Sequence, residues 1–415
     1  MRVKWTVADD VWNLTFLLDP EDEITGNCSD GAALELRTNS CQIRLPKGAT
    51  NGANVHPDLL AVAAWTVVAP WTRQKVTFDR PISPALAEVF RTHWNVDAGP
   101  VGGDPRSGTR LGISYSGGAD SMAAADMFPD APFIHFQRIS HPRVPNRWSF
   151  YRSDVLAGLA QETARETGRE VTTVQSDLEF LLRLPRPGYP EHHAVTVGAL
   201  LLADELDLGG IALGYELGSR WLGGDRYTHR YSPDNPMWSA DGKWGRLMSA
   251  VGLPMVLPVG GLSEPVTMRI AMESDLAPYV RWCLRGDRSG PCQKCAKCLR
   301  KELILAAVER RPLRTALSAD STPARKWQEP PPYGGQETIE YGCAHVPGIE
   351  HTPFAKAAAH LQATEESTRW LEHCYAPAIA EIPERWRKQV DAYIADKVGL
   401  MTEDEVRRVE TWGTR

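Results

Sequence analysis

The sequence predicts an α/β protein in which helices wrap a parallel sheet, with an α+β domain before it and a helical region after it. Three patterns support this. Between residues 111 and 310, short apolar strands alternate with helical segments. Residues 1–105 hold several strands in which polar and apolar side chains alternate. Residues 353–415 have a helical pattern throughout.

Length and composition limit the class of protein. At roughly 150 residues per domain, 415 residues predict two or three domains. Apolar residues make up 42% and charged residues 24%, which excludes a largely disordered chain. The apolar stretch 59–71 spans 13 residues and contains a proline, so it is too short to cross a bilayer. The first residues, MRVKWTVADD, lack the apolar core of a secretory signal, so we expect a cytoplasmic protein without a membrane partner.

The charge balance does not indicate a nucleic-acid partner. The chain has 46 basic and 52 acidic residues, a net charge of −6, and therefore no overall basic excess. The expected substrate is a small molecule, a protein or a nucleotide. The N- and C-terminal extensions offer surfaces for a second copy of the chain or for a partner protein.

The N-terminal domain is predicted at residues 1–105. The segment 97–110 contains four glycines and two prolines and little apolar content, so we predict a boundary loop there. The predicted elements before it are strands at 5–19, 32–46 and 74–82, a buried helix at 56–69 and a short amphipathic helix at 84–94.

The central domain is predicted at residues 106–312. We expect Ser153 to cap one of its helices and Gly168 to end it, and Gly209 to end the next. This alternation of strands and helices predicts a parallel sheet. The predicted strands are 111–116, 132–137, 171–177 and 211–216, and the predicted helices are 120–128, 153–168 and 193–209.

The remaining chain divides into a connector and a helical region. The linker is predicted at 313–352, and its proline-rich part, 321–337, is expected to be extended and exposed. Residues 353–415 are predicted to be helical, with helices near 355–374 and 383–399.

Six residues between the first central strand and helix carry the clearest functional pattern: Ser116-Gly117-Gly118-Ala119-Asp120-Ser121. The two glycines let the backbone turn sharply and approach a ligand. Successive N–H groups and the helix N-terminus then form an anion cradle, and the serine hydroxyls add donors. Asp120 would repel a phosphate, so we expect it to hold Mg²⁺ or to orient the loop. The alternative is a glycine turn without a ligand, and the motif is neither GxxxxGK[ST] nor GxGxxG.

These six residues resemble the PP-loop of the N-type ATP pyrophosphatases. The resemblance implies a doubly wound α/β fold of the adenine nucleotide α-hydrolase (HUP) type, and transfer of AMP from Mg²⁺·ATP to a substrate oxygen. Pyrophosphate would lie in the glycine loop and adenine over the neighbouring strand ends. The resemblance implies Asp120, Ser121 and Arg138 as catalytic residues. The implied ATP-binding residues are Ser114, Ser116, Gly117, Gly118, Ala119, Asp120, Ser121, His135, Gln137 and Gly214.

Four of the eight cysteines fall within 16 residues, with the spacing C-x8-C-x2-C-x2-C: Cys283, Cys292, Cys295 and Cys298. Clustered cysteines in a chain without a secretory signal are typical of metal ligands. Four thiolates complete a tetrahedral Zn²⁺ shell with no open position, so we predict a structural zinc site. The alternatives are a redox CxxC pair, an iron–sulfur cluster and four buried cysteines without a ligand.

The glycine loop and the cysteine spacing together resemble 7-cyano-7-deazaguanine synthase (QueC) over about 111–310. Gln137-Arg138 and residues 256–276 add to the resemblance. It implies adenylation of a deazaguanine carboxylate, capture by ammonia as an amide, and a second adenylation that yields a nitrile. QueC-like proteins with flanking extensions occur in antiviral systems, where they are thought to modify a macromolecule or a nucleotide.

Two segments depart from that family. Ser263-Glu264-Pro265 lies where many relatives carry a phosphate-facing lysine, and Arg269 or Arg138 would have to supply that charge. Pro190-Glu191-His192-His193 stands where the relatives have an Arg-Asn pair near the substrate, so the acceptor differs or remains open.

Four further residues are substrate candidates. His192 and His193 precede a helix and could act as acids, bases or donors, with packing or a surface position as the alternative. Glu216 and Arg220 follow a strand at its carboxyl end, where sheets of this class bind ligands.

The sequence therefore predicts an ATP-dependent, AMP-forming carbon–nitrogen ligase with ATP, Mg²⁺ and Zn²⁺ as cofactors. Adenylation turns a poor leaving group into a good one, and ammonia or an amine then attacks. One alternative is a sulfurtransferase acting on tRNA or a small molecule, with Cys41, Cys343 or Cys374 as sulfur carrier. Another is a non-catalytic nucleotide-binding subunit.

Overall fold

The computed structural model describes residues 1–29, 31–49, 54–139, 152–183, 189–222, 238–283 and 285–412. The chain forms two compact units, each described by itself. The first comprises Met1–Ser116, Asp130–Ala212 and Ser232–Val256, and the second comprises Gly117–Pro129, Leu213–Tyr231 and Leu257–Arg415.

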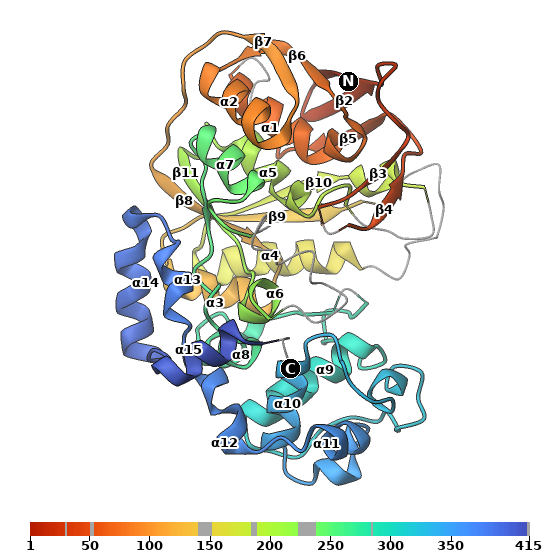
Figure 1. Ribbon diagram of the computed structural model, residues 1–415, viewed down its shortest axis with the longest axis vertical. Helices are drawn as coiled ribbons and strands as arrows, with labels where there is room; N and C mark the ends of the chain where they lie inside the picture. The colour runs from red at the N-terminus through yellow and green to blue at the C-terminus, as the bar shows by residue number, and fades with distance from the viewer. Residues whose placement is uncertain are drawn as a thin grey trace. The chain divides into compact units, whose positions relative to one another are not determined.

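A ten-stranded sheet, most of whose strand pairs are parallel, organises the first unit (Figure 1). The five strands from β12 to β10 are all parallel, whereas β10–β5, β5–β2 and β2–β1 are antiparallel pairs. The predicted α/β class is confirmed. The order is β12 (Met255–Val256), β11 (Leu208–Ala212), β8 (Arg110–Tyr115), β9 (Phe133–Arg138), β10 (Val171–Ser176), β5 (Ser40–Arg44), β2 (Val11–Leu17), β1 (Arg2–Ala8), β6 (Lys75–Ile82) and β7 (Asp97–Val101).

The N-terminal strands extend the same sheet. β5 pairs with β10 through Arg44 opposite Gln175 and Ile43 opposite Ser176. The boundary predicted near residue 105 therefore does not coincide with a break in the sheet. The segment 97–110, predicted to be a loop, begins with β7, which pairs with β6.

The parallel part of the sheet reverses its strand order beside β8. β9 and β10 follow β8 outward on one side, and β11 and β12 lie on its other side. The loops after β8 and β11 therefore leave adjacent strands at their carboxyl ends. Such a reversal is where open α/β sheets bind ligands.

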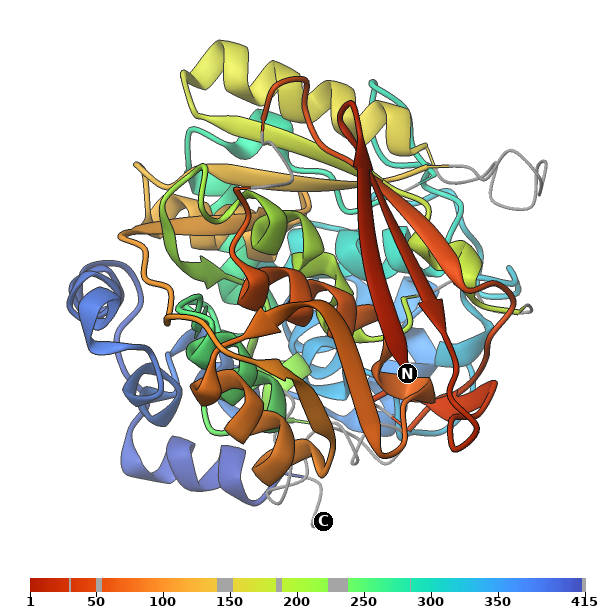
Figure 2. The same cartoon turned by 90° about the horizontal axis from the view of Figure 1, so that it is seen from above.

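Helices cover both faces of the sheet at β9 and β10. Figure 2 shows α4 (Ser153–Thr167) on one side of these strands and α5 (Val197–Leu202) on the other. α1 (Pro57–Val68) packs beside α5 and is almost entirely buried, as predicted. The first unit also contains α2 (Pro84–Val89), α7 (Lys243–Ala250) and a two-stranded sheet of β3 (Thr25–Asn27) and β4 (Ala33–Glu35).

Some predicted boundaries were wrong. Ser153 is the first helical residue of α4 and Arg152 takes the cap position, while Gly168 ends the helix in the left-handed conformation as predicted. The predicted helix 193–209 is a 3₁₀ turn followed by the short α5, and β11 already begins at Leu208. Asp207 has a φ of 50°, which a continuing α-helix does not allow.

The second unit is helical. α3 packs against α8, α8 against α9, and α9 against α10 (Figure 1). The helical C-terminal region is confirmed. The helices are α3 (Ala119–Met127), α6 (Leu217–Arg220), α8 (Glu264–Glu273), α9 (Ala296–Val308), α10 (Gln336–His345), α11 (Ala355–Leu361), α12 (Glu365–Thr368), α13 (Ala376–Ala380), α14 (Glu384–Lys397) and α15 (Glu403–Glu410).

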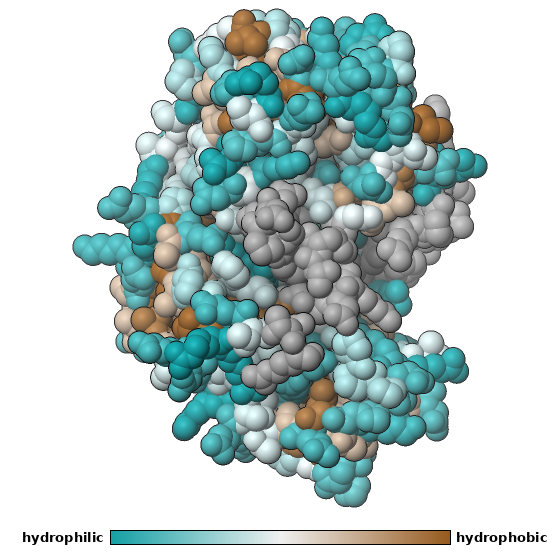
Figure 3. Space-filling view, viewed as in Figure 1, coloured by the Kyte–Doolittle hydropathy of each residue, from teal (hydrophilic) through white to brown (hydrophobic). Residues whose placement is uncertain are grey.

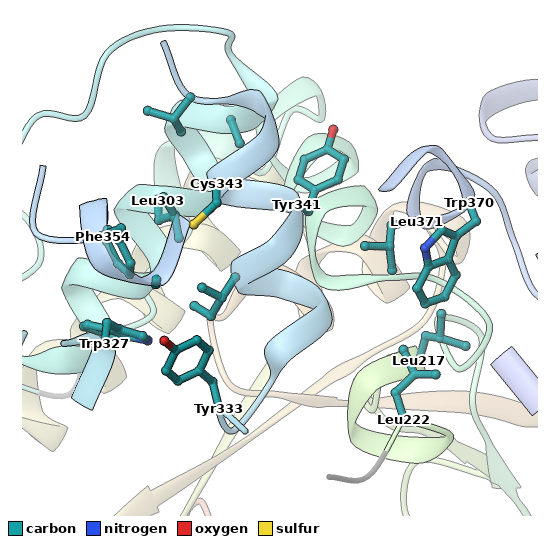
Figure 4. Close-up of a cluster of buried hydrophobic side chains, with 14 of the residues drawn as sticks. Leu217, Leu222, Leu303, Trp327, Tyr333, Tyr341, Cys343, Phe354, Trp370 and Leu371 are labelled. Carbon is teal, nitrogen blue, oxygen red and sulfur yellow. The ribbon is translucent and has the colours of Figure 1, made fainter. Parts of the chain in front are cut away.

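The connector 321–337 is exposed only in part. Residues 329–332 are exposed as expected, whereas Ala324, Trp327, Tyr333 and Glu337 are buried, and Arg325–Trp327 form a 3₁₀ turn rather than an extended chain. Trp327 is fully buried and packs against Phe354 with ring centroids 4.6 Å apart. Figure 4 shows Trp327, Phe354 and Tyr333 on one side of α10, and Trp370 and Leu371 on the other. Burial of large aromatic side chains such as these is a major contribution to stability. α10 itself lies within the predicted linker 313–352.

Hydrophilic residues cover most of the face drawn in Figure 3. Among the described residues, the large exposed apolar side chains are those of Val7, Leu17, Ile24, Val101 and Leu400. Within the described ranges, no helix has the length and apolar character needed to cross a membrane.

Candidate functional site

The glycine loop connects β8 to α3, as predicted. Gly117 has a φ of 74°, a conformation that favours glycine, and Gly118 is the N-cap of α3. Ser121 is 3% exposed, and its hydroxyl donates to the Gly118 carbonyl at 3.0 Å. The buried Ser121 side chain therefore stabilises the turn. In helices generally, the N–H groups of the first turn point away from the helix and favour an anion.

Gly214, which follows β11, lies against this loop. A Cβ atom at Gly214 would be 2.8 Å from the Ser121 nitrogen and 3.0 Å from the Asp120 carbonyl carbon. Both contacts are to backbone, which cannot move aside as a flexible side chain can. The structure thus brings together Gly214, Asp120 and Ser121, three of the predicted site residues.

Replacing Gly214 by alanine is expected to displace the loop. Because the new methyl group overlaps backbone atoms of Asp120 and Ser121, we expect a loss of about 1–3 kcal/mol in unfolding free energy. Chemical denaturation measures this. A variant as stable as the parent chain would mean that the two loops are not in this close contact.

Asp120 is held by residues of α8 and α9. The Thr267 hydroxyl donates to Asp120 Oδ1 at 2.6 Å, and Lys301 Nζ lies 3.9 Å from Oδ2. The Asp120 side chain remains about one-quarter exposed, at 26%. Its carboxylate is therefore fixed in orientation and still accessible to a ligand.

Lys301 also belongs to a buried ion-pair network. Its ammonium lies 2.6 Å from Glu264 Oε1, and Arg300 pairs with Oε2 of the same carboxylate. Burial alone would raise the pKa of Glu264, but the attraction of Arg300 and Lys301 outweighs it and lowers the pKa to about 2. For Lys301, burial would lower the pKa, but Asp120 and Glu264 raise it. Both groups are therefore charged at neutral pH.

Two further carboxyl groups are close to this network and have raised pKa values. Burial raises the pKa of Glu216 to about 8, with repulsion from Glu264, Asp120 and Glu337 adding to it. Burial likewise raises the pKa of Glu337 to about 7. Glu216, predicted as a substrate contact, is the N-cap of α6, where it accepts from the backbone N–H groups of Gly218 and Ser219.

The raised pKa of Glu337 predicts that stability falls with increasing pH. The unfolded carboxyl titrates near 4.5 and the folded one near 7, so the folded state binds more protons between these values. We expect the unfolding midpoint to decrease from pH 5 to pH 8 and the slope to become shallower in Glu337→Gln. The exposed Glu350→Gln is the matched control. An unchanged slope in Glu337→Gln would contradict the assignment.

The four clustered cysteines form a site that fits a metal ion such as zinc. All four sulfurs lie within 4.8 Å of one another. Cys298 Sγ is 3.7 Å from Cys292 Sγ and 3.5 Å from Cys295 Sγ. A tetrahedral Zn–S₄ centre with bonds of about 2.3 Å has sulfurs about 3.8 Å apart, so these distances suit it. Cys295 is also the N-cap of α9 and accepts from the Cys298 N–H at 3.4 Å.

The sequence did not reveal what the basic residues of α9 contact. Lys297 lies just before Cys298 and Arg300 and Lys301 lie after it, at i, i+3 and i+4, a spacing that places them on one helix face and could have indicated a shared role. Arg269, expected to supply the missing charge, instead donates to the Lys397 carbonyl at 3.3 Å. Thr267 and Glu337 do not belong to any sequence motif that would have identified them as site residues.

The predicted residues of β8 and β9 belong to the first unit, as does Ser116. His135 is buried and its Nδ1 bonds to the Tyr115 carbonyl at 3.1 Å. Burial lowers the pKa of His135, which keeps the ring neutral. The Gln137 amide oxygen accepts from Gln175 at 2.9 Å. Ser114, on β8, pairs with Ile134 in the sheet register.

Arg138, predicted as catalytic, makes polar contacts within the first unit. Its Nε donates to the Tyr189 hydroxyl at 2.9 Å, and its NH1 lies 3.3 Å from Glu179. These contacts fix the guanidinium near the end of β9.

The two histidines and Arg220 have packing contacts. His193 is fully buried between the rings of Trp238 and Trp244, with centroids 4.4 and 4.6 Å away. His192 lies at the edge of the same cluster, 6.4 Å from Trp238. In the second unit, Arg220 is buried, pairs with Glu381 and stacks over Trp221. For the two histidines these contacts agree with the packing alternative, and the substrate role stays a prediction.

Residues 243–413 match a family of unknown function (DUF6395). The matched part contains the four cysteines together with Glu264, Lys301 and Glu337, and it does not include the glycine loop. No curated protein and no solved structure matches the chain.

Proposed function

We propose that this protein is an ATP-dependent, AMP-forming ligase that adenylates a carboxylate or amide oxygen for attack by ammonia or an amine. The observation that carries the proposal is the Ser116–Ser121 turn between β8 and α3, with Asp120 fixed by Thr267 and facing Lys301. An anion cradle, a metal-binding carboxylate and a nearby cation are the groups that transfer from ATP requires.

The strand order supports a nucleotide-binding fold of the HUP type. Numbered from β8 onward, the five parallel strands follow the order 3-2-1-4-5, which is that of doubly wound sheets. In such sheets the ligand lies outside the carboxyl ends of the strands that flank the reversal. The glycine loop and Gly214 follow those two strands.

In this proposal, the residues in and around the glycine loop have separate roles. The N–H groups of Gly118 and Ala119 would hold the β and γ phosphates, and the Ser121 hydroxyl, which donates to the Gly118 carbonyl, would keep the turn in the conformation that presents them. The Asp120 carboxylate suits Mg²⁺, a hard cation that prefers oxygen ligands, and Mg²⁺ would neutralise phosphate charge. Lys301, 3.9 Å from Asp120, would supply the positive charge that the resembled family obtains from a lysine near Ser263.

The proposed acceptor is based on the resemblance to 7-cyano-7-deazaguanine synthase. We propose a deazaguanine-type carboxylate, free or attached to a macromolecule or nucleotide, with a role in antiviral defence for the extended chain. The segment Pro190-Glu191-His192-His193 stands where that family has an Arg-Asn pair near the substrate, so the acceptor need not be the family's own. Within this segment Glu191 is buried and accepts from the Ser29 hydroxyl at 2.6 Å.

The alternative of a sulfurtransferase is less well supported. A sulfur carrier needs an accessible thiolate. Cys41, Cys343 and Cys374 are buried, and burial raises the pKa of Cys343 and of Cys374 to about 12 and that of Cys41 well above its usual value. A non-catalytic nucleotide-binding subunit would have no need for the Asp120–Thr267–Lys301 arrangement.

A cysteine variant separates the two enzymes. Ligation needs no carrier thiol, so replacing Cys28, Cys41, Cys343 and Cys374 together by alanine is expected to retain release of AMP and pyrophosphate. Thermal unfolding would verify that the variant is folded. Loss of turnover in a folded variant, traced by single replacements to one thiol, would support the sulfurtransferase instead.

A further inference from the structure

The cysteine loop is connected to the glycine loop at both of its ends. Two residues before Cys283, the Arg281 N–H donates to the Gly117 carbonyl at 2.5 Å. Three residues after Cys298, Lys301 approaches Asp120. The segment that carries the metal ligands therefore touches the glycine loop before its first cysteine and after its last.

The contact through Lys301 depends on the first turns of α9. Cys295 caps this helix and Cys298 lies in its first turn, so the metal ligands fix where α9 starts. Lys301 follows Cys298 by three positions, on the neighbouring turn of the same face. Its side chain is 3% exposed, which leaves it little freedom to compensate for a shift of the helix.

A second route leads from α9 to Asp120 through α8. Arg300 and Lys301 both pair with Glu264, the first residue of α8. One turn later, Thr267 donates to Asp120 at 2.6 Å. A change in α9 would therefore reach Asp120 directly through Lys301 and indirectly through Glu264 and Thr267.

We propose that a metal ion held by the four cysteines positions the glycine loop, with Lys301 as the positioning residue, so that metal binding and nucleotide binding strengthen each other. The inference rests on the proposed function, because it requires that the glycine loop binds a nucleotide. Without the metal, the four thiols are connected by weak sulfur hydrogen bonds, such as that between Cys295 and Cys298, in place of metal–sulfur bonds. By linkage, a nucleotide bound to the loop then raises the affinity for the metal by the same factor.

The experiment measures zinc affinity of the zinc-loaded chain by competition with a zinc-selective chromophoric chelator, with and without saturating Mg²⁺·ATP. Equilibrium dialysis with labelled Mg²⁺·ATP measures nucleotide binding on the same preparation. We expect Mg²⁺·ATP to raise the zinc affinity about fivefold or more.

Three variants test the route. Lys301→Met is expected to keep its zinc and lose most of the Mg²⁺·ATP effect, because Arg300 still pairs with Glu264 while Asp120 loses its cation. Lys301→Arg retains the charge and is expected to keep the effect, which guards against a Lys301→Met chain that does not fold. The exposed Lys294→Met, within the cysteine loop, is the matched control and should behave as the parent chain.

The outcomes are distinguishable. Nucleotide binding with a raised zinc affinity that Lys301→Met abolishes supports the coupling. Nucleotide binding with unchanged zinc affinity overturns the coupling and leaves the proposed function intact. A zinc-loaded chain that does not bind Mg²⁺·ATP overturns the proposed function and this inference with it.

Discussion

Replacing Asp120 by asparagine is expected to reduce AMP formation by on the order of 10²- to 10³-fold, the usual effect of removing one fixed electrostatic group from an active site. Asparagine keeps the shape of the side chain and can still accept from Thr267, so the loop should keep its conformation. The variant loses the negative charge that faces Lys301 and that we propose binds Mg²⁺. Steady-state AMP release and thermal unfolding, measured together, separate the two effects.

The matched control is Asp130→Asn. This exposed aspartate lies just beyond α3 and should affect neither AMP formation nor stability. If Asp120→Asn released AMP at the rate of the control, Asp120 would have no part in the reaction and the glycine loop would be a turn without a ligand.

Removing the metal is expected to destabilise the second unit around α9. Structural zinc contributes about 10–16 kcal/mol in zinc-binding peptides, which is comparable to the whole stability of a typical domain. Cys298→Ser removes one ligand from a helix whose core-facing neighbours, such as Leu299 and Leu303, are fully packed. We expect one zinc per parent chain and loss of both zinc and cooperative unfolding in the variant.

Cys343→Ala serves as the control, because this cysteine is equally buried but lies outside the cluster. It should keep its zinc and lose only about 1 kcal/mol. Elemental analysis that finds iron, or less than half a zinc per chain, would contradict the zinc assignment.

The two candidate sites could be recognised from the sequence because the residues of each lie close together in the chain. The glycine loop lies within six positions and the cysteines within 16, so their spacing is visible in the chain itself. Strand alternation likewise predicted the parallel strands β8 to β11. The boundaries of α4 and α5 were less accurate, because the left-handed Asp207 and the cap at Arg152 follow from local conformation that periodicity does not reveal.

The environment of Asp120 could not be predicted because it depends on contacts between distant segments. Thr267 lies 147 positions from Asp120, and neither residue belongs to a motif that refers to the other. The raised pKa of Glu337 arises from burial beside Glu264, which only the packing of α10 on the rest of the unit creates. The burial of Trp327 and Tyr333 in the connector also depends on contacts with distant segments. The two aromatic residues are visible in the sequence and could have indicated that this proline-rich segment is partly buried.

The most direct test of an AMP-forming ligase is product analysis with ATP labelled separately at the α and γ phosphates. The zinc-loaded chain would be incubated with Mg²⁺·ATP, ammonium and the low-molecular-weight fraction of a cell extract as a source of acceptors. We predict that the α label appears in AMP or in an adenylated acceptor and the γ label in pyrophosphate, and that Asp120→Asn forms both products on the order of 10²- to 10³-fold more slowly. Release of the γ label as phosphate together with ADP would contradict the assignment.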